Sequence, residues 1–287
     1  MLMKFKRERN MNISDFFDKI YVINLPERVD RRREMAKELK SIGLNFNSEK
    51  VKIFPAIKPT EKLAFPSIGV LGCYLSHLEI IKIAKTDKLS HILVMEDDLA
   101  ISSRFCSVQT QLLDELSQVN WDLLFLGYLA YNKLKLSDYY NFYDPDISTT
   151  WTHLKKANYP TLGTHFYAVN HTAYDSLIFF LEELLKKRFQ TCFFEKDPNF
   201  DDLDGAYIDT AYYLFRKQNP ESVSLIVCPY LGWQRSSPSD ISPRMISSSL
   251  DKVVLIKPLV SFLRLIKLKL KKTLDYLKPE LFDWWDI

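Results

Sequence analysis

The stretch HILVMEDDLA, residues 91–100, decides the fold that this sequence predicts. Residues 92–95 form a short continuous apolar run, which is typical of a strand buried on both faces of a sheet. Three carboxylates, Glu96, Asp97 and Asp98, follow without a break. Open α/β folds hold their ligands at the carboxyl ends of the strands, so the sequence predicts an acidic cluster at a ligand-binding edge.

The acidic cluster of Glu96, Asp97 and Asp98 needs a compensating cation. Three like charges this close repel one another and raise one another's proton affinity. Hard oxygen ligands suit Mn²⁺ or Mg²⁺ far better than zinc. The alternative is an acidic surface turn after a strand, and the residues of this stretch alone leave both interpretations open.

The composition is that of a globular protein with a sizeable core. Of 287 residues, 47% are hydrophobic and 14% are aromatic, which fits one large domain or two small ones. Only seven glycines are present, which argues against a propeller or a solenoid. The net charge of +3 is too small for a general nucleic-acid binder, so we expect no nucleic-acid partner.

The cysteines and the apolar segments indicate the compartment. Cys73, Cys106, Cys192 and Cys228 are scattered without a CxxC pair, which favours a reducing compartment and argues against a zinc ribbon. The basic start MLMKFKRERN precedes no apolar segment, so we expect no signal peptide. Because no run of eighteen apolar residues occurs, we expect no transmembrane helix and a cytoplasmic protein.

Strand and helix patterns alternate along the chain, which predicts an α/β fold with a mostly parallel central sheet. The predicted strands are residues 19–24, 51–54, 92–95, 121–126, 165–170 and 224–228, and the predicted helices are residues 30–42, 69–85, 107–119, 172–187 and 210–217. Residues 128–160 are rich in tyrosine and asparagine and show little periodicity, which indicates a long insertion or a lid.

Four arginines gather where the first predicted helix begins. We expect Asp30 to cap this helix, with Arg28 before it and Arg31, Arg32 and Arg33 in its first turn. Positive charge at a helix N-terminus opposes the helix dipole, and a partner anion would remove the conflict. A solvated basic face is the alternative, but the position at the end of a strand favours a phosphate site.

The second predicted helix, residues 69–85, carries two glycines and a Ser-His pair. Gly69 and Gly72 lie in its first turns, where a missing side chain lets the backbone approach a ligand. Ser76 and His77 follow within two turns. A histidine on an apolar helix face is more often a hydrogen-bonded core residue than a ligand, so the pattern alone does not assign His77.

The C-terminal segment differs in character from the rest of the chain. Residues 252–272 contain seven basic residues and no acidic one. Three large aromatic residues, Phe282, Trp284 and Trp285, follow this basic segment. Such a basic amphipathic helix is suited to lie on an anionic membrane surface, which would make the protein membrane-peripheral. The alternative is a helix packed back on the domain with a solvated basic face, and both interpretations stay open.

Six stretches together resemble glycosyltransferase family 25, which includes bacterial lipopolysaccharide-type galactosyltransferases and collagen hydroxylysine galactosyltransferases. They occur in the family's order: IYVINLPERVDR (20–31), GVLGCYLSH (69–77), VMEDD (94–98), WDLLFLG (121–127), GTHFYAV (163–169) and PYLGWQRSSPSDI (229–241). The resemblance implies a GT-A fold, a nucleotide-diphosphosugar donor such as a UDP-sugar, a divalent metal, usually manganese, and inversion at the anomeric carbon.

The resemblance also implies roles for individual residues. The acidic cluster resembles the DxD element of GT-A enzymes, in which Asp98 would hold the metal and Glu96 would face the ribose or assist the metal. The role of Asp97 stays open. The remaining residues expected to line or support the donor pocket are Asn24, Leu25, Arg28, Arg31, Ala56, Gly72, Ser76, His77, Asp97 and Gln234.

Inversion by direct displacement needs a carboxylate that takes the proton of the attacking hydroxyl. The candidates lie in DPNFDDLDGAYID, residues 197–209. Asp204, directly before Gly205, best matches the family's aspartate. Asp209 is the second choice, because it begins a predicted helix and is suited to cap it.

The leading interpretation is a metal-dependent inverting glycosyltransferase that moves a sugar, galactose, from a UDP-sugar to a hydroxyl of a cell-surface glycan such as lipopolysaccharide. A degenerate protein that binds a nucleotide sugar or a glycan without turnover is the alternative. A Mg²⁺-dependent phosphohydrolase lacks support, because no nucleophilic aspartate motif or Walker loop is present. We expect an N-terminal extension (1–17), a GT-A domain (18–250) and a basic amphipathic tail (251–287).

Overall fold

The chain folds around a seven-stranded sheet. The computed structural model describes residues 11–130, 153–157, 161–191, 196–197, 200–235, 266–270 and 272, and for residues 130, 153, 191, 196, 197 and 200–204 it describes the backbone alone. The strand order is β2-β1-β3-β7-β5-β10-β6. The strands are β1 (Lys19–Asn24), β2 (Val51–Pro55), β3 (His91–Glu96), β5 (Leu123–Ala130), β6 (His153–Lys156), β7 (Thr161–Asn170) and β10 (Ser224–Cys228).

Five of the seven strands run in the same direction. β1 is parallel to β2 and to β3, and β5 is parallel to β10. Two strands oppose them: β7 is antiparallel to both β3 and β5, and the edge strand β6 is antiparallel to β10. The predicted α/β fold with a mostly parallel sheet is therefore confirmed, with β7 as the reversed strand inside it.

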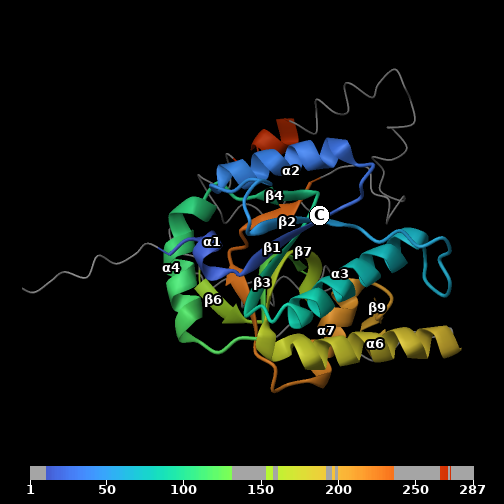
Figure 1. The fold of residues 1–287 in the computed structure, drawn as a ribbon. Helices are drawn as coiled ribbons and strands as arrows, with labels where there is room; N and C mark the ends of the chain where they lie inside the picture. Colours follow the sequence, from blue (N-terminus) through green and yellow to red (C-terminus); the bar gives the residue numbers. More distant parts are fainter. Residues whose placement is uncertain are drawn as a thin grey trace, which may run out of the picture.

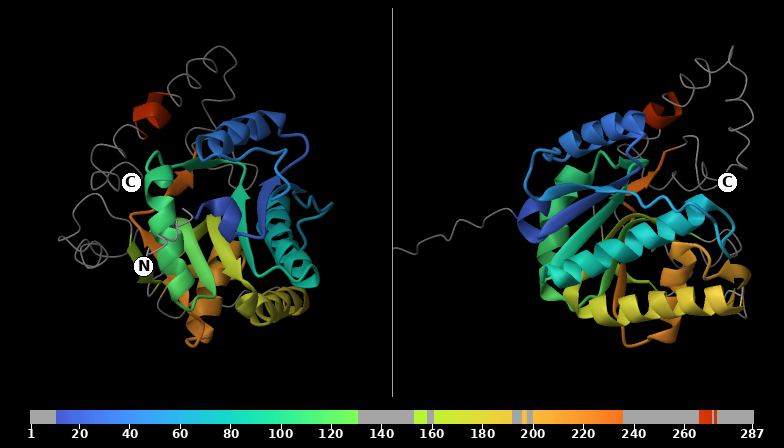
Figure 2. Two further views of the ribbon diagram at one scale, coloured as in Figure 1. Left: turned by 60° about the vertical axis from the view of Figure 1, so that its left-hand side comes forward. Right: turned by 45° about the vertical axis from the view of Figure 1, so that its right-hand side comes forward.

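Helices cover both faces of the sheet. Figure 1 shows α2 (Val29–Ser41) above the sheet, and α3 (Ile68–Thr86), α6 (Tyr174–Thr191) and α7 (Ile208–Gln218) below it, while α4 (Phe105–Gln118) and the short α1 (Ile13–Phe16) lie to one side. The two views in Figure 2 show the same three layers. The continuous apolar run 92–95 follows from this arrangement, because Ile92 and Val94 belong to one core cluster and Leu93 and Met95 to the other.

A short antiparallel pair of strands lies beside the main sheet. β4 (Leu99–Ile101) pairs with β11 (Gly232–Gln234), with Trp233 opposite Ala100 and Gln234 opposite Leu99. This pair brings the end of β11 back to the acidic cluster. A second pair joins β8 (Lys196–Asp197) to β9 (Phe200–Asp204). The sequence predicts neither pair, because strands of two to five residues have too little periodicity to be recognised.

Two helix starts differ from the prediction. Arg28 is the residue before α2 and makes no side-chain cap, so the assignment of Asp30 as the N-cap is wrong. Asp30 lies in the first turn and accepts hydrogen bonds from Arg28 Nε (3.1 Å) and from its terminal nitrogen (3.0 Å). α7 begins at Ile208, so Asp209 also lies inside the first turn. At both positions the negative side chain interacts favourably with the positive end of the helix dipole.

The predicted insertion at 128–160 contains strand structure at both of its ends. β5 continues to Ala130, and β6 forms the edge of the sheet. Residues 131–152 and 158–160 of this insertion lie outside the described residues.

The described part of the C-terminal tail packs on the domain. Residues 266–270 are helical and lie beside α2 (red in Figures 1 and 2). The Lys272 ammonium lies 2.8 Å from Glu38 Oε2, and the Ser103 hydroxyl donates to the Lys272 carbonyl at 3.2 Å. Leu268 is partly buried against the core. Across the described residues, no helix is long and apolar enough to cross a membrane.

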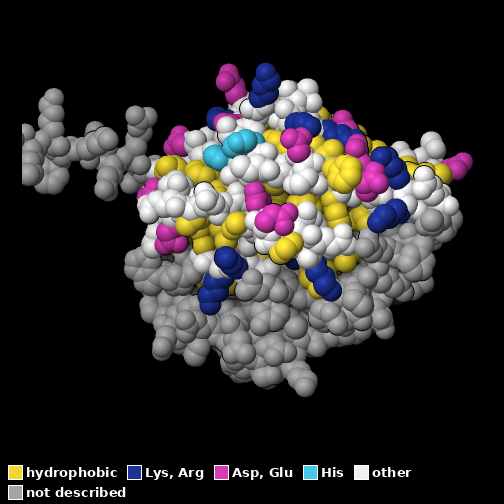
Figure 3. Space-filling model, turned by 90° about the horizontal axis from the view of Figure 1, so that it is seen from below, with side chains coloured by type: hydrophobic (Ala, Val, Ile, Leu, Met, Phe, Trp, Pro, Cys, Tyr) yellow, Lys and Arg dark blue, Asp and Glu magenta, His cyan; other side chains and the backbone are white. Residues whose placement is uncertain are grey.

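Ion pairs join α6 to α3 on the lower face of the molecule. Lys82 lies 2.6 Å from Glu182, and Lys85 pairs with Asp175. Seen from below, this face carries basic and acidic side chains interspersed with apolar ones (Figure 3). The described part of the face therefore shows no field of a single sign.

Candidate active site

The acidic cluster lies where the parallel strands β1 and β3 end together. In the register of these strands Ile23 is opposite Glu96, so Asn24 and Asp97 follow side by side. β11 delivers Gln234 and Arg235 to the same edge from far along the chain. Arg235 is bonded to the backbone of the cluster: its N–H donates to the Asp98 carbonyl at 2.7 Å and its guanidinium to the Asp97 carbonyl at 2.6 Å.

Asp97 is buried and fully used in holding this edge together. Its Oδ2 accepts a hydrogen bond from Asn24 Nδ2 at 2.7 Å, and its Oδ1 accepts one from Arg31 at 2.8 Å. Asn24 is itself buried, and its Oδ1 accepts from Arg32 Nε at 3.0 Å. The sequence leaves the role of Asp97 open, and in this geometry both of its carboxylate oxygens have partners within the protein.

The arginines at the start of α2 are paired with the protein's own oxygens. The buried Arg31 lies 2.8 Å from Asp97 Oδ1 and 3.5 Å from Asp98 Oδ2. Arg28 pairs with Asp30. Arg31 thus meets the acidic cluster and Arg28 meets Asp30, while the phosphate site suggested by the four arginines stays a prediction.

Asp98 is the member of the cluster with an unused oxygen. Its Oδ1 is buried and has no hydrogen-bond partner among the described residues. Burial raises the pKa of Asp98 to about 7, with a further increase from the charge of Glu96, although Arg31 and Arg235 oppose it. The positive charges near Asp98 are therefore not enough to offset the effect of burial on its carboxylate.

Glu96 is held by three side chains from three elements. The Thr164 hydroxyl donates to Oε1 at 3.0 Å, His77 Nε2 lies 3.5 Å from the same oxygen, and Gln234 Nε2 donates to Oε2 at 3.4 Å. Burial acts to raise the pKa of Glu96, but the nearby His77, together with His165 and Thr164, outweighs it, so that the pKa is lowered. The pKa values of Glu96 and Asp98 are therefore shifted in opposite directions, although only Asp97 lies between them.

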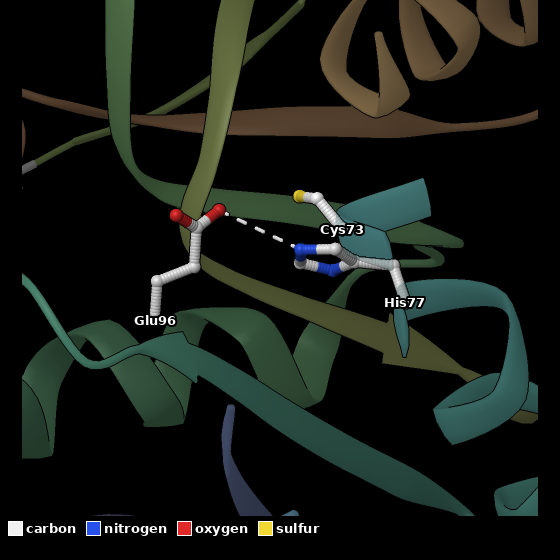
Figure 4. A group of neighbouring side chains, drawn as sticks. All are labelled: Cys73, His77 and Glu96. Carbon is white, nitrogen blue, oxygen red and sulfur yellow. Dashed lines mark ion pairs between the residues drawn. The ribbon is translucent and has the colours of Figure 1, made fainter. Parts of the chain in front are cut away.

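His77 is completely buried and points at Glu96 from α3 (Figure 4). Its Nδ1 lies 2.8 Å from the Tyr167 hydroxyl, which in turn accepts a hydrogen bond from the Tyr212 hydroxyl at 3.1 Å. Its Nε2 has no hydrogen-bond partner within the part of the chain that the structure describes. One ring nitrogen is thus anchored in the core while the other faces the site.

Gly72 and Ser76 hold the loop after β2 against α3. A Cβ atom on Gly72 would lie 2.4 Å from the Ile57 carbonyl oxygen. The Ser76 hydroxyl accepts from the Ile57 N–H at 2.8 Å and donates to the Gly72 carbonyl at 2.6 Å. The expectation that Gly72 opens space for a ligand is therefore wrong, because the space is filled by backbone. Ala56 is fixed in the same loop by its N–H bond to the Asn24 carbonyl at 3.0 Å.

The two candidate bases lie on either side of Gly205. Asp209 Oδ2 accepts from the Gly163 N–H at 3.1 Å and Oδ1 from the Thr210 N–H at 2.8 Å. Burial raises the pKa of Asp209; these two hydrogen bonds act to lower it, and the charge of Glu96 adds to the increase. Asp204 ends β9, and its side chain lies outside the described residues.

Several site residues are absent from the sequence-based assignments. Thr164 and Tyr167 lie in the GTHFYAV stretch, Arg235 follows Gln234 in the closing stretch, and Cys73 lies in GVLGCYLSH. Their positions inside these stretches are the one feature of the sequence that could have identified them. Their contacts could not be predicted, because they depend on how β7 and β11 pair.

Comparison with known proteins supports the family suggested by the sequence. The family model described as "Glycosyltransferase family 25 (LPS biosynthesis protein)" matches residues 17–188. Procollagen galactosyltransferase 1-B of Xenopus laevis is 33% identical over 129 residues, which are 39% of this chain and 21% of that protein. Human procollagen galactosyltransferase 2 is 29% identical over 129 residues, with the same shares of the two chains.

The human "Inactive glycosyltransferase 25 family member 3" is also 29% identical over 129 residues, which are 39% of this chain and 22% of that protein. The matched region thus spans about a fifth of the length of these curated relatives.

Among solved structures, one similar chain is a glycosyltransferase involved in the glycosylation of the major capsid of PBCV-1. It has a TM-score of 0.39 and 13% identity, over 76% of this chain and 93% of that chain. The apo-form glycosyltransferase GlyE of Streptococcus pneumoniae TIGR4 has a TM-score of 0.34 and 8% identity, over 72% and 44% of the two chains. Since the family model covers more than half of the 287 residues, this protein belongs to glycosyltransferase family 25.

Proposed function

We propose that this protein is a metal-dependent inverting glycosyltransferase that moves galactose from a UDP-sugar to a hydroxyl of a cell-surface glycan such as lipopolysaccharide. One observation carries the proposal: in a member of this family, Asp98 Oδ1 is a buried carboxylate oxygen without a hydrogen-bond partner among the described residues, two residues from Glu96 at a strand end. Such an oxygen is costly to bury unless a cation or a donor is placed against it.

The residues at this edge fit a hard divalent cation. Asp98 and Glu96 offer carboxylate oxygens, which are the ligands that Mn²⁺ and Mg²⁺ prefer. The raised pKa of Asp98 is the expected result of burial beside Glu96, which Arg31 and Arg235 offset only in part. We assign both residues as the protein's metal ligands; when bound, the metal would offset the charge that builds on the departing diphosphate.

The other residues of the edge position these ligands and the nucleotide. Asn24 and Arg31 fix Asp97, and this holds the turn that carries Asp98. We assign Leu25 and Ala56 to the wall of the nucleotide pocket, because both follow strand ends next to this turn. Gln234 is exposed, and its side chain donates a hydrogen bond to Glu96. We therefore assign it to a contact with the nucleotide-sugar donor.

A carboxylate from the segment 197–209 serves as the base in this proposal. It accepts the proton of the acceptor hydroxyl as that oxygen attacks the sugar. We retain Asp204 for the role, because both oxygens of Asp209 already accept backbone N–H groups, and these bonds join α7 to β7.

The substrates in the proposal come from the names of relatives. Galactose is suggested by the procollagen galactosyltransferases and lipopolysaccharide by the description of the family model. The similarity to an inactive family member supports a second candidate, a protein that binds a nucleotide sugar or a glycan without turnover.

Two measurements test the proposal. A thermal-shift screen of UDP-sugars with and without Mn²⁺ should give a rise in Tm that needs both components, since a ligand that binds only the folded state stabilises it. Release of UDP from the selected donor should then require Mn²⁺ and be lost in Asp98→Asn. Binding without UDP release, with or without a glycan acceptor, would favour the non-catalytic alternative, and no binding to any UDP-sugar would contradict both.

A further inference from the structure

We propose that Cys73, His77 and Glu96 form a site for a thiophilic transition-metal ion of the Zn²⁺ class, next to the hard-oxygen site at Asp98. The three side chains come from two elements that pack together, α3 and β3, and they face one another in Figure 4. A thiol, an imidazole and a carboxylate are the usual protein ligands of Zn²⁺.

The three ligand atoms lie close enough together to bind a single ion. Cys73 Sγ, a ring nitrogen of His77 and a carboxylate oxygen of Glu96 all lie within 4.8 Å of one another. His77 Nε2 and Glu96 Oε1 are 3.5 Å apart, a separation that suits two ligands of one ion with bonds of about 2 Å. Cys73 and His77 are four residues apart on α3, so both project from the same face of the helix.

The surroundings provide the second layer of contacts that metal sites need. The Tyr167 hydroxyl, which accepts a hydrogen bond from Tyr212, lies 2.8 Å from His77 Nδ1 and can accept a hydrogen bond from Nδ1–H, which leaves the Nε2 lone pair free to bind a metal. The Thr164 hydroxyl orients Glu96 by donating to Oε1 at 3.0 Å. Two of the three ligands are therefore held in place before any ion arrives.

The buried imidazole of His77 points to a cation here. His77 is fully buried, and its Nε2 faces the group without a hydrogen-bond partner in the described part of the chain. The thiol of Cys73 and a carboxylate oxygen of Glu96 lie within 4.8 Å of it. A divalent ion would bind this nitrogen, and the thiol releases its proton to solvent as the metal–sulfur bond forms.

An ion bound by Cys73 and His77 should also affect sugar transfer, and this part of the inference rests on the proposed function. Glu96 is shared with the site at Asp98, so an ion held by Cys73 and His77 draws Glu96 toward α3. Zn²⁺ should therefore inhibit transfer that Mn²⁺ supports, and do so through Cys73.

Co²⁺ is the probe for the metal site, because it replaces zinc and its bond to a thiolate gives a charge-transfer absorption band. Titration of the purified, metal-free full chain should give this band with saturation at one equivalent, and Zn²⁺ should remove it, since zinc binds such ligands more tightly than cobalt. Mn²⁺ in excess should leave the band in place. If no thiolate band develops, the proposal is wrong.

Matched cysteine variants locate the sulfur. Cys73→Ser should lose the thiolate band, whereas Cys106→Ser should keep it, because Cys106 is an exposed thiol on α4 whose Sγ lies 3.2 Å from the Ser41 carbonyl oxygen. Tyr167→Phe should weaken Co²⁺ binding about 10- to 100-fold, the usual effect of removing such a supporting contact. A band that survives Cys73→Ser, or that disappears in Cys106→Ser, would overturn the assignment.

The activity measurement is kept separate from the absorption measurement. Zn²⁺ should inhibit Mn²⁺-supported UDP release in the wild type and in Cys106→Ser, and inhibit Cys73→Ser at least about tenfold less strongly. If the protein showed no UDP release at all, the proposed function would fail, while the Co²⁺ band would still decide the metal site.

Discussion

Three consecutive carboxylates, Glu96, Asp97 and Asp98, have three different environments. The pKa of Glu96 is lowered by His77 against the effect of burial, Asp97 is buried in contact with Arg31 and Asn24, and the pKa of Asp98 is raised by burial. Adjacent residues on a turn point in different directions, so their partners come from different elements. The chemistry of the cluster is therefore set residue by residue.

Asp98→Asn should keep the fold and abolish Mn²⁺-dependent binding of a UDP-sugar. The change removes one charge from a group of repelling carboxylates and leaves a side chain of the same shape. Asp97→Asn is the control, since it removes one partner of a buried pair and should cost about 2 kcal/mol or more of stability. Chemical denaturation and calorimetric titration of Mn²⁺ measure the two effects. Unchanged Mn²⁺-dependent binding in Asp98→Asn would remove the metal assignment.

In the metal-free protein, Asp98 should make stability depend on pH between about 4 and 7. The folded pKa is raised to about 7 from an ordinary value of 3.8. The folded state therefore keeps a proton that the unfolded state has released, and stability falls as the pH rises through this window. The free energy of unfolding, measured with a chelator present, should fall more steeply in the wild type than in Asp98→Asn. Parallel curves would contradict the raised pKa.

Asp204→Asn should bind UDP-sugar and Mn²⁺ normally while transfer falls by about 10²-fold or more, the usual scale for loss of a general base. Asp209→Asn is the comparison. It offers only one oxygen to two backbone N–H donors, so it should cost about 1–3 kcal/mol of stability and leave transfer by the folded protein nearly unchanged. Reversed results would make Asp209 the base, and normal transfer in both variants would place the base outside this segment.

At the scale of elements, α3 holds the loop after β2 in place. Gly72 lets the Ile57 carbonyl approach the helix, and Ser76 bonds the Ile57 N–H. Ala56 is the neighbouring residue, and its N–H is bonded to the end of β1. The GVLGCYLSH stretch thus fixes the position of a loop that follows a different strand.

Gly72→Ala should destabilise the protein although alanine is the better helix former. The gain in helix propensity is about 1 kcal/mol, but the new Cβ would lie 2.4 Å from a backbone oxygen. Overpacking of this kind costs about 1–3 kcal/mol and more where backbone must move, so we expect a net loss in denaturant unfolding.

Gly205→Ala is the matched control for Gly72→Ala. Its Cβ would meet the ends of Leu184 and Leu214 at 3.3 and 3.5 Å, and these side chains can adjust. Equal stability changes in the two variants would contradict the packing role of Gly72.

At the scale of the whole molecule, the described residues of the C-terminal tail pack against α2. Lys272 binds the buried Glu38, whose Oε2 also accepts the Ile101 N–H at 2.9 Å. The tail is thereby joined to α2 and β4 of the domain. Of the two interpretations of the basic tail, packing on the domain is the one that these contacts support, while the cytoplasmic location and the division at residues 17 and 250 stay predictions.

Lys272→Ala should lower the free energy of unfolding by about 1 kcal/mol, because Glu38 loses its closest charged partner. Glu38 keeps its backbone donor, and Arg235 stays 4.0 Å away. Lys267→Ala, at an exposed position of the same helical segment, should change it by less than about 0.5 kcal/mol. Denaturant unfolding of the full chain compares them. If the two substitutions had the same effect, the contact with Glu38 would not hold the tail.

The sequence alone determined the layered α/β fold, the strand ends that carry the site and the family. Each depends on local information: a continuous apolar run requires helices on both faces of its strand, and short motifs keep their order along the chain. The acidic stretch 96–98 is likewise recognisable without its partners.

Only the tertiary structure decided which partners these residues have. It showed that Asp97 is bonded to Asn24 and Arg31, that Gly72 accommodates backbone, and that Gln234 reaches Glu96 across 138 residues of sequence. The physical reason is that periodicity reports which face of an element is buried, whereas a partner is chosen by strand pairing and by helix packing between distant segments. Those choices depend on the whole core, so no local pattern contains them.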